Sequence, residues 1–213
     1  MAISYLTFIK HAEKMVKDIG FAKPALKGVY HAHDGSVVVS DGNRIYAAKN
    51  VQSRNDGASI DPETGKLLDG TYPDVNPLIP TGFIDQLQVQ STTYLHLVTD
   101  AFIKAGVVPK QGEKKGKKED VVLTLSSCVS GKHTELAVKS KSLNADIDLG
   151  PTQYNNDFVY EINAEQFLQA LKLFKDAGYE ELYIKFYQDE FAIKLVSTDD
   201  NQTLTAVIPV VLD

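Results

Sequence analysis

The feature that most constrains this chain is a pair of Asp-Gly dipeptides placed one strand length apart. Asp34-Gly35 and Asp41-Gly42 each stand between short runs of apolar, β-branched or aromatic residues. Because glycine reaches positive φ without steric cost, Asp-Gly in this setting is a strong short-range signal of a β-hairpin. The sequence therefore predicts a three-strand antiparallel meander over residues 27–33, 36–40 and 44–49.

The segment before this meander predicts an amphipathic helix over residues 3–19. Its apolar residues recur at helical spacing and form one broad stripe, and the opposite side carries Lys10, Lys14 and Lys17. Gly20 is a suitable C-cap, and Pro24 prevents continuation.

The same order, a helix and then a three-strand meander, recurs twice. A helix is predicted at 92–105, and a second helix follows Asn163 and Gln166, which form a capping box. Strands are expected at 86–90, 121–129, 133–141, 145–149, 158–162, 182–187, 191–197 and 203–212. Three helix-plus-meander units predict an α+β fold with the helices on one face of antiparallel sheets.

The turn-rich segment 51–80 separates the first unit from the other two. Asp-Gly pairs and prolines dominate it, so an extended linker is expected with a boundary near Pro80. The expected division is residues 1–80, one unit plus linker, and residues 81–213, a domain of two units.

Composition restricts the class of protein. The chain of 213 residues is 43% apolar, enough for a sizeable core. No apolar run is long enough to span a bilayer, and the N-terminus lacks the apolar h-region of a signal peptide. The single cysteine suits a reducing compartment. A cytoplasmic protein is therefore expected. The net charge of −6 argues against a simple basic protein that coats DNA.

Several residues allow two interpretations. Arg44 is either the wall of a peptide pocket or an exposed charge at a strand end. Residues 206–212 are either an apolar edge strand, interrupted by Pro209, that holds an extended peptide, or a plain core strand. The lysines of the three helices either face phosphates or are ordinary solvated charges.

The remaining sequence features do not predict a catalytic site or a complete metal site. His31 and His33 lie on one strand face as half of a metal site, but no partner His or Cys is evident. Cys128 is expected to be structural, and the lysine-rich run 110–118 is expected to be a solvated loop without a Walker motif. With no nucleophile elbow and no catalytic carboxylate pair, neither an enzyme nor a cofactor is predicted.

Three stretches together resemble the bacterial β sliding clamp, the processivity subunit of the replicative polymerase. Residues 40–45, SDGNRI, look like the T-D-G-H-R-L motif of that family. Residues 67–80, LLDGTYPDVNPLIP, are similar to its L-x-D-G-x-[FY]-P-D-Y-x-x-x-[IL]-P motif, and residues 206–212, AVIPVVL, to its C-terminal Y-V-V-M-P-M-R-L. The order of the three stretches also matches, over nearly the whole chain.

The resemblance implies a homo-oligomeric ring around duplex DNA, with helices lining the hole, sheets outside, and a surface pocket for a Gln-x-x-Leu-Phe-type peptide of a polymerase or other replication protein. The implied peptide-binding residues are Ser40, Gly42, Asn43, Arg44, Ile45, Pro73, Leu78, Ile208, Pro209, Val210 and Leu212. The implied DNA-facing residues are Lys10, Lys14, Lys17, Lys104, Lys172 and Lys175. No membrane partner is expected.

The chain departs from the family in having three helix-plus-meander units where the family has six. A shortened clamp of this kind suits a phage or mobile element. The odd number of units also motivates an alternative function, a non-encircling adaptor or decoy that keeps the peptide pocket.

Overall fold

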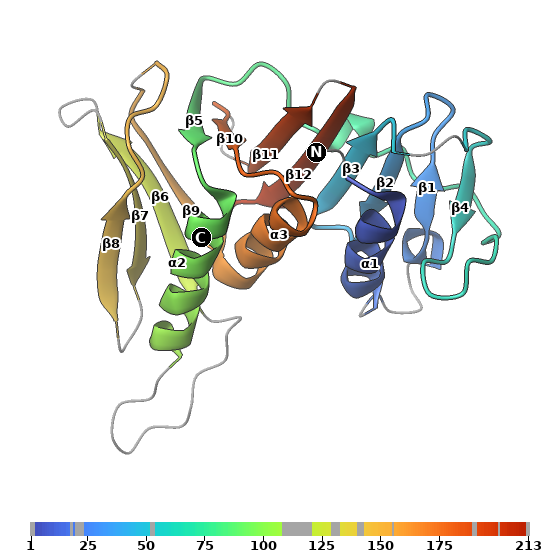
Figure 1. The fold of residues 1–213 in the computed structure, drawn as a ribbon, viewed down its shortest axis with the longest axis horizontal. Helices are drawn as coiled ribbons and strands as arrows, with labels where there is room; N and C mark the ends of the chain where they lie inside the picture. The colour runs from blue at the N-terminus through green and yellow to red at the C-terminus, as the bar shows by residue number, and fades with distance from the viewer. Residues whose placement is uncertain are drawn as a thin grey trace.

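The computed structural model describes residues 3–17, 19, 24–51, 54–107, 121–128, 133–139, 143–154, 156–188, 191–199 and 201–211. Within these residues it contains three α-helices and two antiparallel sheets (Figure 1). The α+β class expected from the sequence is confirmed.

Each helix begins at a side-chain cap that its sequence supplies. In α1 (Tyr5–Val16), Ser4 Oγ accepts from the backbone N–H of Thr7 at 3.1 Å. The caps of α2 (Thr92–Gly106) and α3 (Ala164–Asp176) are Ser91 and Asn163. Because a cap satisfies backbone donors that lack an intrahelical partner, these residues set where the helices start. Helix α1 is shorter than the predicted span 3–19.

The larger sheet joins the first unit to the last. Its strand order is β4-β1-β2-β3-β12-β11-β10-β5. The strands are β1 (Val29–His31), β2 (Val37–Ser40), β3 (Ile45–Lys49), β4 (Ala58–Ile60), β5 (Asp85–Val89), β10 (Leu182–Phe186), β11 (Ala192–Asp199) and β12 (Gln202–Pro209). The predicted opening meander is confirmed, with Val38 opposite Ala47 and Tyr30 opposite Val38.

The smaller sheet has the order β8-β7-β6-β9 and consists of β6 (Val122–Cys128), β7 (His133–Lys139), β8 (Asn144–Asp148) and β9 (Phe158–Asn163). Two strands change places between units. Strand β5 precedes α2 but pairs with β10, and β9 precedes α3 but pairs with β6. This exchange ties the second and third units together, whereas the division at residue 80 stays a prediction.

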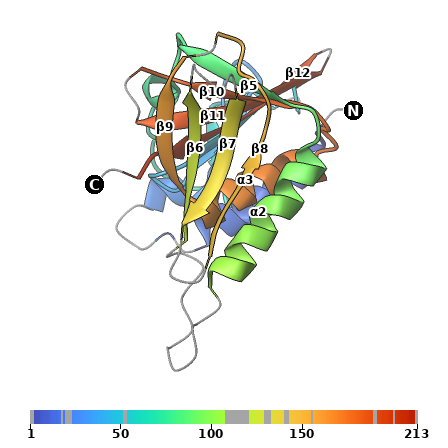
Figure 2. The same ribbon diagram turned by 90° about the vertical axis from the view of Figure 1, so that its left-hand side faces the viewer.

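The three helices lie next to one another along one side of the sheets, with α3 between α1 and α2 (Figures 1 and 2). Their apolar stripes and the inward sheet faces share one core, in which Phe8, Phe167 and Phe174 are at most 1% exposed. Among the helices described, none is long and apolar enough to cross a membrane.

Residues 58–80 are more ordered than the extended linker that the sequence predicts. They contribute β4, and residues 72–79 return across the sheet face opposite the helices, with a short 3₁₀ helix at Asn76–Leu78. A second apolar cluster forms there, in which Tyr72 and Val75 pack with Ile45 and Val207, and Tyr72 stacks on Tyr30 at 5.3 Å between ring centroids.

Candidate functional site

Arg44 is held inside the turn rather than exposed. Its side chain reaches Asp41, with Nε 2.8 Å from Oδ2, and its Nη1 donates to Gln169 Oε1 on α3 at 2.6 Å. The residue is 9% exposed. The guanidinium therefore connects the β2–β3 turn to the helix layer. Its N–H groups that bond Asp41 and Gln169 are already engaged within the protein.

The other predicted residues of this turn have structural contacts of their own. Ser40 is 3% exposed, and its Oγ accepts from the backbone N–H of Gly42 at 3.1 Å. Gly42 has φ +92°, the left-handed conformation that the Asp-Gly turn requires. Asn43 is exposed. Ile45 is 4% exposed and belongs to the cluster on the face opposite the helices.

The predicted pocket residues at the end of β12 differ in how deeply they are buried. Ile208 is fully buried in the main core, whereas Pro209 is half-buried and pairs with Ala192. Val210 forms an isolated bridge to Ile162 on β9, which brings the end of this strand against the smaller sheet. Leu212 lies outside the described residues.

A groove opens on the sheet face opposite the helices, where the returning linker meets the start of β11. Its volume is about 540 Å³, and it is lined by residues 77–82 together with Tyr187, Gln188, Phe191 and Ala192. Leu78 and Phe191 both line this groove and are 64% and 67% exposed, so it presents large apolar side chains to solvent. Of the predicted pocket residues, Leu78 lies in this groove. Pro73 lines a smaller cavity of about 330 Å³ beside Tyr30 and Tyr72.

Two polar groups lie beside the groove. The Nζ of Lys194 on β11 donates to the carbonyl oxygen of Pro80 at 2.6 Å and lies 5.4 Å from the centroid of the Tyr187 ring. Burial, and next the charge of Lys185, lower the pKa of Lys194. Burial raises the pKa of Tyr187, whose Oη has no hydrogen-bond partner among the described residues.

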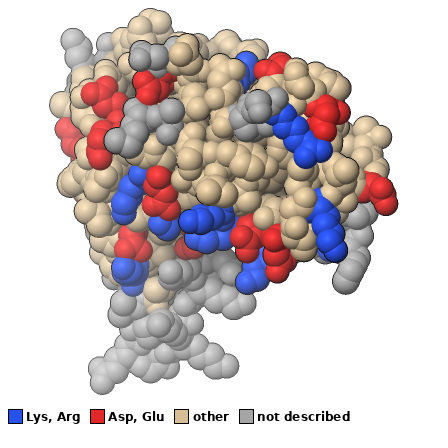
Figure 3. Space-filling view, turned by 45° about the vertical axis from the view of Figure 1, so that its right-hand side comes forward, with Lys and Arg blue, Asp and Glu red and all other residues tan. Residues whose placement is uncertain are grey.

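The helix face carries both signs of charge. Lys10, Lys14 and Lys17 of the α1 segment are exposed. Two of the other predicted lysines are paired within their own helices, since Lys104 Nζ lies 2.5 Å from Asp100 Oδ2 and Lys172 Nζ lies 2.8 Å from Asp176 Oδ2. Lys175 is half-buried on α3. In Figure 3, which brings the β1–β4 side forward, basic and acidic side chains are intermixed.

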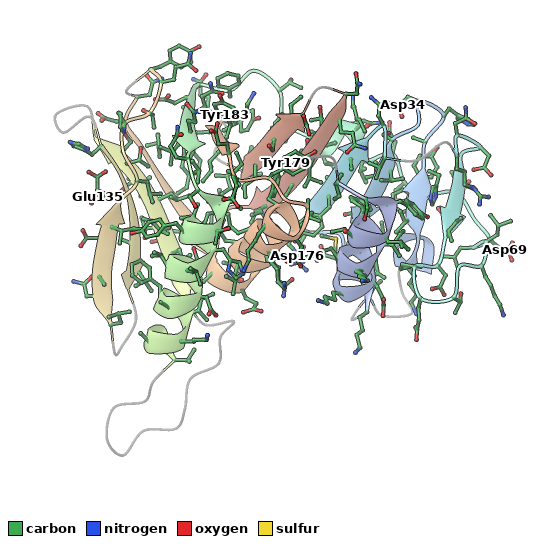
Figure 4. The ribbon with its side chains drawn as sticks, viewed as in Figure 1. Asp34, Asp69, Glu135, Asp176, Tyr179 and Tyr183 are labelled. Carbon is green, nitrogen blue, oxygen red and sulfur yellow. The ribbon has the colours of Figure 1, made fainter. Side chains whose placement is uncertain are left out.

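Asp176 also joins α3 to α1. Its Oδ2 lies 3.1 Å from Nε2 of His11, a residue that is 7% exposed. Asp176 itself is labelled on α3 in Figure 4. Burial lowers the pKa of His11 more than the neighbouring carboxylate raises it. The pKa of Asp176 is also lowered: burial alone would raise it, but bonds and charges from Lys172 and His11 outweigh that effect.

The two histidines of the first strand have separate protein partners. His31 is 1% exposed, and its Nε2 lies 2.8 Å from Tyr5 Oη. His33 is exposed, and its Nδ1 lies 2.8 Å from the carbonyl oxygen of Asn55. The described residues contain no group of three or more metal-ligating side chains. Cys128 lies in β6 as expected, and residues 110–118 lie outside the described part of the chain.

Sequence reasoning missed Phe191 and Tyr187, which line the groove, and Lys194, which lies beside it. A large apolar residue directly after the polar turn 188–190 was the available signal for Phe191. Asp85 was also missed. It is fully buried on β5, and its carboxylate accepts four hydrogen bonds, from Gln86, Thr152, Tyr154 and Asn156.

The sequence matches no protein-family model and no curated protein. Its structure is similar to that of the β subunit from DNA polymerase of Streptococcus pyogenes, with a TM-score of 0.72 at 15% identity, over 100% of this chain and 68% of that one. The sliding clamp from Bacillus subtilis gives a TM-score of 0.70 at 16% identity, and the β sliding clamp of C. crescentus 0.69 at 15%; both cover 100% of this chain. They are covered over 64% and 65% of their own lengths, so this chain spans about two thirds of such a protein. The likeness establishes the sliding-clamp fold.

Proposed function

We propose that this chain is a sliding-clamp-like processivity factor, which encircles duplex DNA as a homo-oligomer and holds a polymerase or other replication protein by a peptide. The observation that carries the proposal is the layering. Three helices stand along one side of the sheets, and a groove with exposed apolar side chains opens on the other. Such a role needs no chemistry and no cofactor, because a tether acts by raising effective concentration.

The helix side supports contact with DNA mainly through α1. Lys10, Lys14 and Lys17 are exposed and have no ion pair among the described residues. Flexible single contacts from ammonium groups to phosphates carry no sequence information and permit sliding. The pairing of Lys104 and Lys172 with carboxylates of their own helices reduces what α2 and α3 add.

The opposite side supports the peptide site. Leu78 and Phe191 present apolar surface from two segments of the chain that meet at the groove. A Gln-x-x-Leu-Phe-type peptide brings two large apolar side chains, whose burial against such a groove provides the main favourable term in binding.

Oligomerisation requires a surface that a second copy can join. Among the described strands, β8 has one neighbour, β7, so its other edge is open, and its residues Asn144, Asp146 and Asp148 are exposed. An open edge is a natural site for strand pairing between chains. We propose that this edge forms one of the contacts between copies.

Native mass measured by light scattering at micromolar concentration tests the oligomer. A discrete closed oligomer is expected. A monomer that still binds the peptide favours the second candidate function, an adaptor or decoy that uses the groove without enclosing DNA. The observation that supports this second function is the odd number of helix-bearing units, three among the described residues.

Peptide binding tests the groove. Leu78→Asp and Phe191→Asp are each expected to weaken a labelled Gln-x-x-Leu-Phe peptide at least tenfold in fluorescence polarisation, since each places a charge on apolar lining. Arg44→Ala weakens the peptide severalfold if the site extends to the β2–β3 turn, and an unchanged affinity restricts the site to the groove. Unchanged binding in both groove variants would sink the assignment.

A further inference from the structure

Lys194 lies on β11, on the sheet face opposite the helices, between one like charge and one apolar side chain. In the sheet register, Lys185 of β10 is directly opposite it on one side, and Val207 of β12 is directly opposite it on the other. Val207 belongs to the apolar cluster of that face, and so does Ala192, which shares a strand face with Lys194. At these positions the neighbouring strands offer Lys194 no anion.

The contacts of the two ammonium groups do not neutralise them. Lys194 Nζ donates to the carbonyl oxygen of Pro80 at 2.6 Å and lies 5.4 Å from the centroid of the Tyr187 ring. Lys185 Nζ lies 4.3 Å from the centroid of the Phe83 ring. Among the described residues, neither lysine forms an ion pair with a carboxylate. Because like charges directly opposite in a sheet are unfavourable, the pair favours the loss of one proton.

Two features favour the neutral amine at Lys194. Burial, and next the charge of Lys185, lower the pKa of this residue. One N–H of the neutral amine still satisfies the carbonyl oxygen of Pro80, so deprotonation does not break that hydrogen bond. The neutral amine is the nucleophilic form of lysine, and desolvation beside a second cation activates it.

We propose that Lys194 is a modification site, which a small acyl phosphate acylates at Nζ. The amine attacks the carbonyl carbon of the donor, a C–N bond forms, and the C–O bond to phosphorus-bound oxygen breaks. Phosphate leaves with the electron pair of that bond, and the proton of the attacking nitrogen passes to phosphate or water. This proposal goes beyond the clamp-like role and does not depend on it.

The surroundings of Lys194 also suit the product. An acylated Nζ carries no charge, so the repulsion with Lys185 disappears, and its remaining N–H can still donate to Pro80. The residue is half-buried, which leaves part of its side chain open to a small donor. Pro80 and Tyr187, which Nζ contacts, both line the groove of about 540 Å³, so the added acyl group has space next to it.

Acetylation rates of individual lysines test the proposal. The full chain is treated with acetyl phosphate at pH 7.5, and peptide mapping by mass spectrometry follows each lysine over time. Lys194 is expected to react at least about threefold faster than Lys10, Lys14 and Lys17, although these three are exposed and Lys194 is half-buried. Accessibility alone predicts the reverse order. In guanidinium chloride the advantage of Lys194 should vanish, because its cause is the folded environment.

Variants of the full chain assign the cause. Lys185→Met should slow acetylation of Lys194 at least about twofold at pH 7.5, because it removes the opposed charge, whereas Lys185→Arg retains that charge and should keep the rate. Lys194→Arg should remove the fastest lysine phase from intact-mass kinetics. Lys66→Arg, a matched substitution of an exposed lysine elsewhere in the chain, should leave that phase unchanged. Thermal melting verifies that each variant is folded.

Three results would overturn the proposal. The first is that Lys194 in the folded chain reacts no faster than the exposed lysines of the α1 segment. The second is that its advantage persists after unfolding, which would place the cause in the local sequence. The third is an unchanged rate in Lys185→Met, which would show that the opposed pair does not activate the amine.

Discussion

The buried carboxylate of Asp85 offers a sharp test of how this fold is held together. It anchors the segment between β8 and β9 to β5. Oδ1 accepts from the backbone N–H groups of Gln86 and Tyr154, at 2.8 and 2.9 Å. Oδ2 accepts from Thr152 Oγ1 and from the backbone N–H of Asn156, both at 2.8 Å. Asp85→Asn keeps the shape of this side chain but removes its charge and one acceptor.

The magnitude follows from counting these bonds. The amide oxygen of the variant still serves one pair of donors, and the hydroxyl of Thr152 can rotate to accept from the new NH₂ group. The N–H of Asn156 then faces a donor and loses its partner. Hydrogen bonds to charged groups contribute about 1.5–3 kcal/mol each, so the free energy of unfolding should fall by about 2–4 kcal/mol in Asp85→Asn.

Urea unfolding followed by circular dichroism measures this change, since the chain contains no tryptophan. Asp69→Asn, the same substitution at an exposed position of the 58–80 segment, is the matched control and should stay within about 0.5 kcal/mol of the parent. A loss below about 1 kcal/mol for Asp85→Asn would refute the anchoring role derived from these four bonds.

Three further predictions concern the turn, the helix face and pH. Arg44→Met should lower the free energy of unfolding by about 2–4 kcal/mol in urea, because it leaves a largely buried carboxylate unpaired; a neutral result would contradict the structural role of this guanidinium. Burial holds the pKa of His11 below its ordinary value near 6.5, so the unfolded chain takes up the proton first, and the free energy of unfolding should decrease as pH falls from 6.5. His11→Gln should flatten that dependence between pH 7.5 and 5.5, and an unchanged slope would show that other groups cause it. The three exposed lysines of the α1 segment are Lys10, Lys14 and Lys17. Replacing all three by glutamate should reduce DNA-dependent processivity in a primer-extension assay and leave peptide affinity intact. Undiminished processivity would show that these lysines are not part of a DNA interface.

Local signals were sufficient for the elements themselves. The two Asp-Gly pairs placed the turns of the opening meander, and Gly42 has the positive φ that the pattern requires. Asn163 caps α3 through the N–H of Gln166, as the capping box predicts, although Gln166 Oε1 has no hydrogen-bond partner among the described residues. Turn and cap chemistry acts over a few residues, so it can be found without knowledge of the rest of the chain.

Long-range pairing could not be derived in the same way. Strand β4 was missed because it is a three-residue strand inside a turn-rich segment, and its identity as a strand depends on pairing with β1. The exchange of β5 and β9 between units was missed for a related reason. Each has an ordinary strand pattern, and nothing within it specifies which unit it joins.

The sequence by itself thus determined the α+β class, the three helices and the meanders, because hydrophobic period and turn chemistry are properties of short segments. Only the tertiary structure decided which face each side chain occupies. It placed Ile208 in the core, turned Arg44 toward α3, and brought the carbonyl of Pro80 within 2.6 Å of Lys194, a residue 114 positions later in the chain. The physical reason is strand register. The pairing of β3 with β12 fixes the orientation of every side chain on both strands. That pairing in turn depends on packing across the whole domain.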